Sequence, residues 1–223
     1  TVPDDAWVAW DAENQVFLTA AEVYTEPVTA DVKSVVTYPA DLFTTVTYHD
    51  GSPISVADFV LTMIMNFDPG DENSVIYDPS QAGALSSFLS TFRGVKIIST
   101  DPLVIETYTV GFQLDAELNV TTWWPQLGYG ESPWHVIAMG NKAEMAEELA
   151  YSPDKSDALQ VEWMNIVAGP SLEILAKYLD EAEAESYIPY EATLGQYITP
   201  EEAAARYANL KQFYADRGHF WVG

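Results

Sequence analysis

The spacing of the apolar residues changes abruptly at Asp50-Gly51, and this change constrains the fold more than any other feature of the sequence. Before it, Val32–Tyr38 and Thr44–His49 are rich in β-branched and aromatic residues, and Thr44–His49 alternates with the period of two that is typical of strands. Asp-Gly is a frequent turn dipeptide, because glycine adopts the positive φ that tight turns require. The first 50 residues are therefore predicted to be strand-rich, with a turn at Asp50-Gly51.

A helix is predicted directly after this turn. Ser55 and Asp58 have the spacing of a capping box, in which each side chain bonds the backbone N–H of the other residue. Apolar residues then recur at helical spacing, and Asp68-Pro69-Gly70 ends the pattern. The prediction is a helix over Val56–Phe67, with the Ser55 hydroxyl bonded to the amide of residue 57 or 58.

The middle of the chain predicts a helix followed by a hairpin. Ala82–Phe92 has the composition of a helix. Val95–Ser99 and Leu103–Thr109 are β-rich runs joined by a short turn that contains proline, which predicts two antiparallel strands. Leu118–Glu131 is predicted to be a loop, because it contains proline and two glycines.

The last third of the chain is predicted to be helical. The clearest signal is Thr199-Pro200-Glu201-Glu202, which combines an N-cap, a proline at the first helical position and a capping-box Glu. This signal predicts a helix over Pro200–Asp216 whose apolar face carries Ala203, Tyr207, Leu210 and Tyr214. Three further helices are predicted at Lys142–Ala150 (capped by Asn141), Ser156–Ala168 and Ser171–Ser186.

The order of these elements predicts an α+β fold, with mixed strands and a hairpin followed by a helix-rich C-terminal half. Strands and helices do not alternate regularly, so neither a doubly wound sheet nor a barrel is expected. The chain begins without Met and closes on apolar residues better suited to a core than to a tail. We therefore expect it to be a piece of a longer protein.

The charge of the chain excludes several classes of partner. Nine Lys and Arg stand against 34 Asp and Glu, which gives a net charge of −25 at pH 7. Nucleic acids and anionic membrane surfaces bind basic footprints, so neither is expected here. The absence of cysteine excludes disulfides and Cys-ligated metal sites. The three histidines show no zinc-type spacing, and no metal site is predicted. No apolar run approaches the roughly 20 residues of a membrane-spanning helix.

The acidic residues are spread along the whole chain, so we interpret the charge as a property of the surface and not as a binding site. Repulsion between like charges then destabilises the folded state, and salt weakens this repulsion by screening. The melting temperature is expected to rise when NaCl is raised from a low concentration to about 0.5 M. Circular dichroism measures this change, and a melting temperature independent of NaCl would contradict the interpretation.

No catalytic residue and no cofactor are predicted. The sequence contains neither the G-x-S-x-G elbow of hydrolases nor a G-x-x-x-x-G-K or G-x-G-x-x-G phosphate loop. The alternative function is a carbohydrate-active enzyme or its accessory module, since paired carboxylates act as acid and base on glycosidic bonds. The carboxylates offer no isolated pair with apolar flanks, and those of Asp180–Glu185 fall on the polar side of a predicted helix.

Tryptophans flank a Gly-rich stretch in the predicted loop. Trp123-Trp124-Pro125 precedes it and Pro133-Trp134-His135 follows it. Exposed tryptophans at such a place stack on sugar rings or hold peptide side chains. The alternative is that they fill the junction between the hairpin and the later helices. Trp123, Trp124 and Trp134 are therefore the candidate ligand-binding residues.

The turn and the helix after it also carry a motif. Residues 48–60 read aromatic–x–Asp–Gly–x–Pro–aliphatic–Ser–x–x–Asp–x–Val, with the fixed positions occupied by Asp50, Gly51, Pro53, Ser55 and Asp58. This segment resembles the signature of family 5 extracellular solute-binding proteins. The members of that family are the oligopeptide-, dipeptide-, nickel- and, in some cases, oligosaccharide-binding receptors of ABC importers.

Three other segments are consistent with this resemblance. The hairpin Gly94–Val110 follows where the family has a strand pair. Pro133–Ile137 is similar to the family's Val-Pro-Lys-His-Ile segment, with Trp134 in place of the usual Lys. Trp221–Gly223 would fit just before the family's Gly-Thr-Gly-Pro-Tyr turn. The helical stretch Asn141–Gly218 departs from the family, whose typical members have a shorter one.

The resemblance implies part of a type II periplasmic-binding-protein-like receptor, in which two lobes close on a solute by hinge motion. Residues 1–54 would be the strand-rich part of the first lobe, 55–135 a small subdomain and 136–223 a helical segment that returns to the first lobe. The implied ligand is an oligopeptide or oligosaccharide, and the implied partners are ABC permease subunits. The protein would not be an enzyme. It would lie in the periplasm or on the extracellular face of the membrane, secreted or anchored as a lipoprotein. No family ligand residue matches a position in this sequence.

Overall fold

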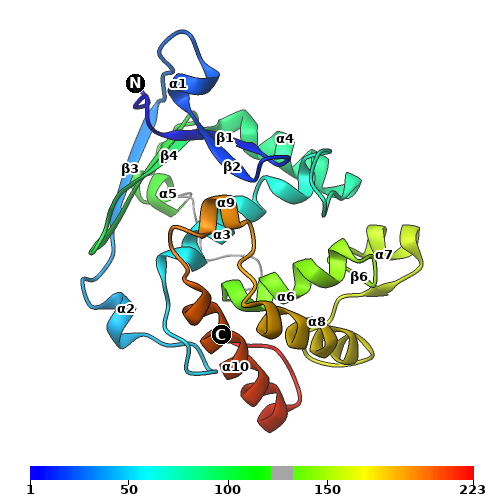
Figure 1. The fold of residues 1–223 in the computed structure, drawn as a ribbon. Coiled ribbons are helices and arrows are strands. Elements are labelled where there is room, and N and C mark those ends of the chain that lie inside the picture. Colours follow the sequence, from blue (N-terminus) through cyan, green and yellow to red (C-terminus); the bar gives the residue numbers. More distant parts are fainter. Residues whose placement is uncertain (122–132) are drawn as a thin grey trace.

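An antiparallel sheet and a group of helices lie on two sides of helix α3 in the computed structural model, which describes residues 1–121 and 133–223 (Figure 1). The strands are β1 (Trp7–Asp11), β2 (Val16–Thr19), β3 (Val32–Thr37), β4 (Phe92–Thr100), β5 (Leu103–Thr109), β6 (Leu149–Ala150) and β7 (Glu162–Trp163). The helices are α1 (Ala20–Val23), α2 (Leu42–Thr45), α3 (Val56–Met65), α4 (Ala82–Thr91), α5 (Ala116–Thr121), α6 (Trp134–Met145), α7 (Pro153–Leu159), α8 (Ser171–Glu185), α9 (Glu191–Leu194) and α10 (Pro200–Arg217), with 3₁₀ turns η1 (Asp68–Gly70) and η2 (Pro79–Gln81).

The sheet is built around the predicted hairpin. Within the described residues, five strands pair in the order β2-β1-β4-β5-β3, all antiparallel. β3 pairs with β5 along its whole length, which confirms the predicted strand near Val32–Tyr38. β1 pairs with β4 only where Trp7 lies opposite Val95. The C-terminal part of β4 therefore extends past the end of β1, as Figure 1 shows on its left side.

Helix α3 lies at the centre of the core because nearly every one of its side chains is buried. Phe59, Leu61 and Ile64 of α3 belong to one hydrophobic cluster, which also includes Ile105 of the sheet and Leu210 of α10. This cluster draws residues from all three of the ranges 1–54, 55–135 and 136–223. The division of the chain into these ranges stays a prediction.

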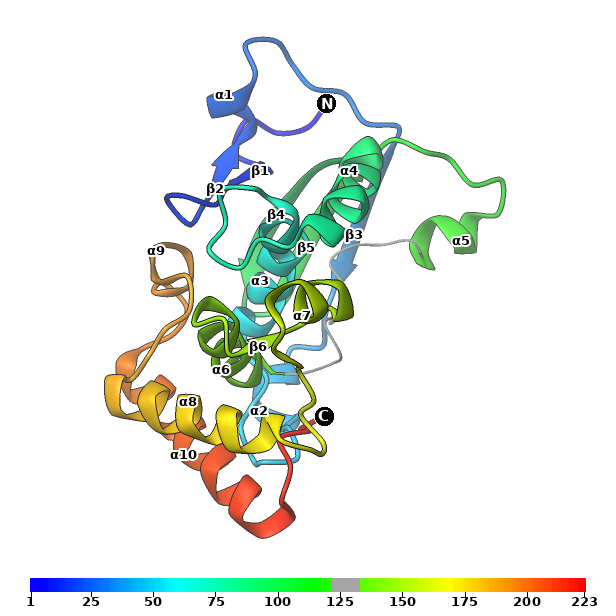
Figure 2. The ribbon, with the colours of Figure 1, turned by 90° about the vertical axis from the view of Figure 1, so that its right-hand side faces the viewer.

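The C-terminal half is helical, as predicted. α6 contacts α8, and α8 contacts α10. Figure 2 shows α8 and α10 side by side at the lower end of the molecule, while α5 projects on the right of this view. The predictions of α3, α4, α8 and α10 are confirmed to within two residues at each end. The mixed α and β character is confirmed as well, and the receptor-like architecture stays a prediction.

The strand predicted at Thr44–His49 is wrong. Its first residues belong to α2, and only a single bridge joins Thr47 to Pro53 across the turn. The hydroxyls of Thr44 and Thr45 donate to the Asp41 carbonyl at 3.0 and 2.8 Å. Such local side-chain bonds compete with strand pairing and explain the helical turn.

Two helices of the C-terminal half were predicted with wrong bounds at both ends. The first, Lys142–Ala150, falls on the last residues of α6 and on strand β6. Asn141 is not an N-cap, since it lies inside α6, where its buried side chain is bonded by Tyr151. In place of a helix over Ser156–Ala168, α7 ends at Leu159, because Gln160 adopts the left-handed conformation. The predicted loop Leu118–Glu131 begins inside α5, and its residues from 122 onward lie outside the described part of the chain.

Candidate functional site

The motif segment folds into a tight turn that leads into α3. Gly51 has a φ of +83°, a conformation that favours glycine because other residues are strained there. The Asp50 carboxylate accepts hydrogen bonds from the backbone N–H and the hydroxyl of Ser52 at 2.9 and 3.1 Å. Pro53 forms the bridge to Thr47. Asp50, Gly51 and Pro53 therefore shape the turn.

The predicted capping box is present at the start of α3. The Asp58 carboxylate accepts from the backbone N–H of Ser55 at 2.8 Å, and the Ser55 side chain faces the N–H of Asp58. Replacing Ser55 by alanine is expected to cost about 1 kcal/mol, the usual loss for an N-cap. Urea unfolding measures the free energy. Replacing exposed Ser87 by alanine is the control, and equal stability of the two variants would contradict the role of Ser55.

Asp58 also bonds two segments that lie far away in the sequence. Its Oδ1 accepts from the backbone N–H of Trp134, the first residue of α6, at 2.8 Å. Nη1 of Arg206 in α10 lies 3.4 Å from both carboxylate oxygens. The side chains of Asp58 and Arg206 are both buried. Asp58 therefore fixes the start of α3 and α6 and pairs with a charge on α10.

Arg206 is the cation of this buried group. Its Nη2 lies 3.2 Å from Oε1 of Glu202, one turn earlier in α10, and its guanidinium lies 5.2 Å from the ring centre of Trp134. Burial raises the pKa of Glu202, against the opposing effect of Arg206. The guanidinium is thus held between two carboxylates and an aromatic ring, which offsets part of the cost of burying it.

Asp50 forms a second buried pair, with His135 of α6. The His135 Nε2 and the Asp50 Oδ2 are 2.7 Å apart, and both side chains are fully buried. Burial lowers the pKa of His135 despite the nearby carboxylate, so the ring is neutral. Because an ionised carboxylate only accepts, the proton lies on Nε2 and Nε2–H donates to Asp50.

The chain end joins the same region. The His49 N–H donates to the Gly223 carbonyl at 3.1 Å, and the His49 ring lies edge-on to Trp221. Three segments distant in sequence therefore meet: residues 48–60, 133–137 and 221–223. The buried residues Asp50, Asp58, His135 and Arg206 hold residues 48–60 and 133–137 together. We call these four residues the motif cluster.

Of the three tryptophans predicted to bind a ligand, only Trp134 lies within the described residues. Trp134 is completely buried, with its ring between Arg206 and Tyr207. Its predicted role in stacking on a ligand is therefore corrected to a role in the core, because the ring has no exposed face. Trp123 and Trp124 lie outside the described residues.

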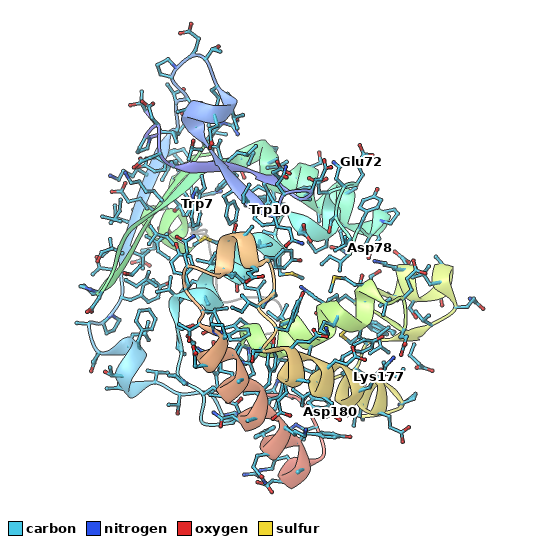
Figure 3. All side chains as sticks on the ribbon, in the orientation of Figure 1. Trp7, Trp10, Glu72, Asp78, Lys177 and Asp180 are labelled. Atoms are coloured by element: carbon cyan, nitrogen blue, oxygen red, sulfur yellow. The ribbon has the colours of Figure 1, made fainter. Side chains whose placement is uncertain are left out.

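A cleft of about 430 Å³ opens on another side of the molecule. One wall consists of residues between Ser74 and Ser80, and the other consists of Glu144, Glu147 and residues of α7. Figure 3 shows Asp78 on the segment that faces α7. We call this feature the acidic cleft, because its lining contains Asp78, Glu144, Glu147, Asp154 and one cation, Lys155.

Two charged residues of the acidic cleft, the buried Glu144 and the largely covered Lys155, pair with each other. Lys155 Nζ donates to Glu144 Oε1 at 2.7 Å and to the Ile76 carbonyl at 3.1 Å. Glu144 Oε2 also accepts from the Tyr151 N–H at 2.6 Å. Burial nevertheless raises the pKa of Glu144. The bond from Lys155 to the Ile76 carbonyl joins the two walls, since Ile76 belongs to one wall and Lys155 to the other.

A buried hydrogen-bond network lies between the cleft and the sheet. Asp68 accepts from Trp10 Nε1 at 2.7 Å, from the Ser74 hydroxyl at 2.6 Å and from the Tyr190 hydroxyl at 2.8 Å. Asn141 Nδ2 in turn donates to the Tyr190 hydroxyl at 3.3 Å. Figure 3 labels Trp10 on β1, close to the segment that carries Asp78. The network connects the sheet, the Asp68 turn and α6.

The pH dependence of stability tests the burial of Asp68. Burial raises its pKa although three donors favour the ionised form. As pH rises, Asp68 therefore ionises in the unfolded chain before it ionises in the folded protein. Its contribution to stability decreases between the usual carboxyl pKa and the raised pKa. The stability difference between the wild type and Asp68→Asn is expected to shrink as pH rises above the usual carboxyl pKa of about 4.

Asp78 provides a control of opposite sign. Burial opposes its ionisation, but hydrogen bonds from Ser152 and Ser80 outweigh this effect and lower the pKa of Asp78. Its contribution is present above the usual carboxyl pKa and decreases as pH falls. The difference between the wild type and Asp78→Asn is therefore expected to grow as pH rises. Urea unfolding at several pH values measures the free energy of unfolding of the wild type and both variants. If the two stability differences changed with pH in the same way, the opposite pKa shifts of Asp68 and Asp78 would be contradicted.

Among residues 1–121 and 133–223, no group of three or more histidine and carboxylate side chains could hold a metal ion. No helix in the same residues is both long and apolar enough to cross a membrane.

Comparison with known proteins gives no assignment: no family model and no curated protein matches this chain.

Sequence reasoning missed Arg206, Glu144 and Lys155. Arg206 had a visible signal, because it lies on the apolar side of the predicted helix, next to Tyr207 and three residues after Ala203. The chain has only nine basic residues, and a basic residue on the apolar side of a helix indicates a buried partner. Glu144 and Lys155 had no comparable signal, since their pairing depends on how α6 and α7 pack.

Proposed function

We propose that this chain is a solute-binding component of an ABC importer, with a fold of the type II periplasmic-binding-protein kind. Such a protein holds a small solute, an oligopeptide or an oligosaccharide, and delivers it to permease subunits. It would act in the periplasm or on the extracellular face of the membrane, as a secreted protein or a lipoprotein. The proposal includes no catalytic step.

The observation that carries the proposal is the meeting of the segments that resemble family 5 proteins. The motif turn and α3 bond the Pro133–Ile137 segment through Asp50 to His135 and through Asp58 to the Trp134 N–H. The end of the chain bonds His49. Segments that resemble one family and also lie together favour a shared origin over three chance similarities.

We place the solute in the acidic cleft. Its volume of about 430 Å³ is within the range of small-ligand pockets, and its lining combines apolar side chains with a few polar groups that orient a ligand. Ser80 and Tyr77 supply hydroxyls, and Val75 and Leu159 supply apolar surface. This lining suits a solute that has both polar and apolar groups.

A ligand panel tests the function and the site together. Di- to pentapeptides and oligosaccharides are screened by thermal shift, binding is measured by calorimetry, and chromatography follows the ligand for breakdown. A peptide or sugar bound without turnover is the expected result. A ligand that is bound and hydrolysed would favour the carbohydrate-active enzyme. Because the chain is expected to be one part of a two-lobed receptor, weak binding is the expected result, and a panel in which no peptide or sugar binds even weakly would contradict the placement of the solute on this chain.

A matched pair of variants locates the solute. Val75 lines the cleft and is 62% exposed, so Val75→Arg is expected to fill the cleft without disturbing the core and to weaken binding by about tenfold or more. Val167 is 54% exposed and lies outside the lining, so Val167→Arg is the control. Equal affinities of both variants would place the solute elsewhere.

A further inference from the structure

The edge of β4 that faces away from β5 is only partly paired. β1 covers it where Trp7 lies opposite Val95. In the described residues, no backbone hydrogen bond to another segment is found on this side from Lys96 to Thr100. Figure 1 shows the hairpin continuing past β1 on the left of the molecule. An open strand edge carries free N–H and C=O groups and is a template for another strand.

A groove runs along this open edge. It has a volume of about 390 Å³ and is lined by residues Val95–Thr100, by Asp5 and Trp7, and by Gln196 and Tyr197 after α9. The strand edge is thus one wall, and side chains of a separate segment lie opposite it. A groove with two walls has room for one extended chain. The edge strand of a folded sheet would not fit, because the other strands of that sheet would come with it. We call this feature the β4-edge groove.

The charges of the groove indicate which chain fits. Asp5 is exposed at 67% of its side chain, and it pairs with Lys96 through both oxygens at 2.7 Å. Lys96 is the single cation of the lining, so the described groove has no unpaired cation for a terminal carboxylate. An internal segment, which has no charged ends, therefore fits better than a free peptide. The net charge of −25 favours a segment with a basic side chain.

The apolar side chains of the groove add contacts. A register shift in the pairing of β4 with β5 leaves Ile98 out of the ladder, with 47% of the residue exposed. Trp7 is stacked on Phe17 with ring centres 4.6 Å apart, which holds its ring in place at the end of the groove. Strand addition typically combines backbone bonds with such side-chain contacts.

We propose that the β4-edge groove binds an extended, basic internal segment of another protein, which pairs with β4 as an additional strand. This interaction surface is separate from the acidic cleft and does not depend on the proposed transport function. The added strand would lie beside the unpaired part of β4, opposite residues Lys96–Thr100.

The probe is the peptide VKSVVT, acetylated at its N-terminus and amidated at its C-terminus. It has a strand-forming sequence, one lysine and no charged ends. At a peptide concentration ten times its Kd, hydrogen exchange of the outward amides in Lys96–Thr100 is expected to slow by about tenfold. The Lys-to-Glu version of the peptide is expected to bind more weakly. Protection of the β3 edge alone, or of no residue, would overturn the proposal.

N-methylation distinguishes strand pairing from simple apolar contact. Alternate residues of a strand direct their N–H groups to opposite edges. Methylating residues one, three and five of the peptide, or residues two, four and six, removes the donors of one edge only. One of these two peptides is expected to lose binding and the other to keep it. Equal binding by both would overturn strand addition.

Two variants of the protein locate the site. Ile98→Arg places a cation in the groove and is expected to weaken the basic probe by about tenfold. Val35→Arg, at a β3 position that is 54% exposed, makes the same change on the same sheet outside the groove and is expected to leave binding unchanged. Equal loss in both variants would show that the charge of the protein, and not the groove, determines binding.

Discussion

Replacing Asp58 by alanine is expected to destabilise the protein by about 3–5 kcal/mol, because it leaves the buried Arg206 without this partner. The change also removes the acceptor for the Ser55 and Trp134 backbone N–H groups at the starts of α3 and α6. Unfolding in urea at pH 7 measures the loss. A cost below about 1 kcal/mol would contradict the central role of Asp58.

Two further variants test whether the unpaired charge of Arg206 causes the loss of stability. Asp180→Ala removes an exposed carboxylate that pairs with Lys211, and little change in stability is expected. Asp58→Ala/Arg206→Met removes both buried charges, and it is expected to be more stable than Asp58→Ala alone, since no unpaired charge remains. If the double variant is less stable than the single one, Arg206 stabilises the fold through its contacts with Glu202 and Trp134 even when Asp58 is absent.

The sequence predicted best those elements whose signals are local. α3 begins at the predicted capping box, in which Asp58 accepts from the Ser55 N–H, and α10 begins at Thr199, whose hydroxyl accepts from the Glu202 N–H at 3.2 Å. The β4–β5 hairpin follows from two β-rich runs on either side of a short turn. In each case the residues that determine the structure are close neighbours in the chain.

The wrong predictions concern residues whose partners are distant. Asn141 resembles an N-cap, but its side chain bonds Tyr151 and Tyr190 inside the core, so tertiary contacts override the local preference. The true start of α7 carried an unused signal: Ser152 accepts from the Lys155 N–H, and Pro153 follows it. The same pattern was interpreted correctly at Thr199-Pro200.

The candidate site could be predicted only in part for the same reason. Asp50 and Asp58 were recognised from their spacing, and their roles in the turn and the capping box are local. Their bonds to His135 and to the Trp134 N–H join residues more than 70 positions apart. No periodicity in the sequence indicates such pairs, which appear only when the helices are packed.

Replacing Lys155 by methionine is expected to cost about 3–5 kcal/mol at pH 7, because Glu144 then remains buried without its cation. Burial already raises the pKa of Glu144, and the loss of Lys155 removes the interaction that opposes this shift. At low pH, Glu144 takes up a proton and the unpaired charge disappears. The cost is therefore expected to be largest at neutral pH and to fall as pH is lowered.

Lys177→Met is the matched control, since Lys177 forms an exposed pair with Glu148, and little change in stability is expected at either pH. The double variant Glu144→Gln/Lys155→Met should recover part of the stability and lose the pH dependence, because it carries no charge at this place. Urea unfolding at about pH 5 and about pH 7 compares the three variants. A cost of Lys155→Met that is equal at both pH values would mean that Glu144 is not the group left unpaired. The joining of the two walls of the acidic cleft would then depend on packing and on the bond from Lys155 to the Ile76 carbonyl.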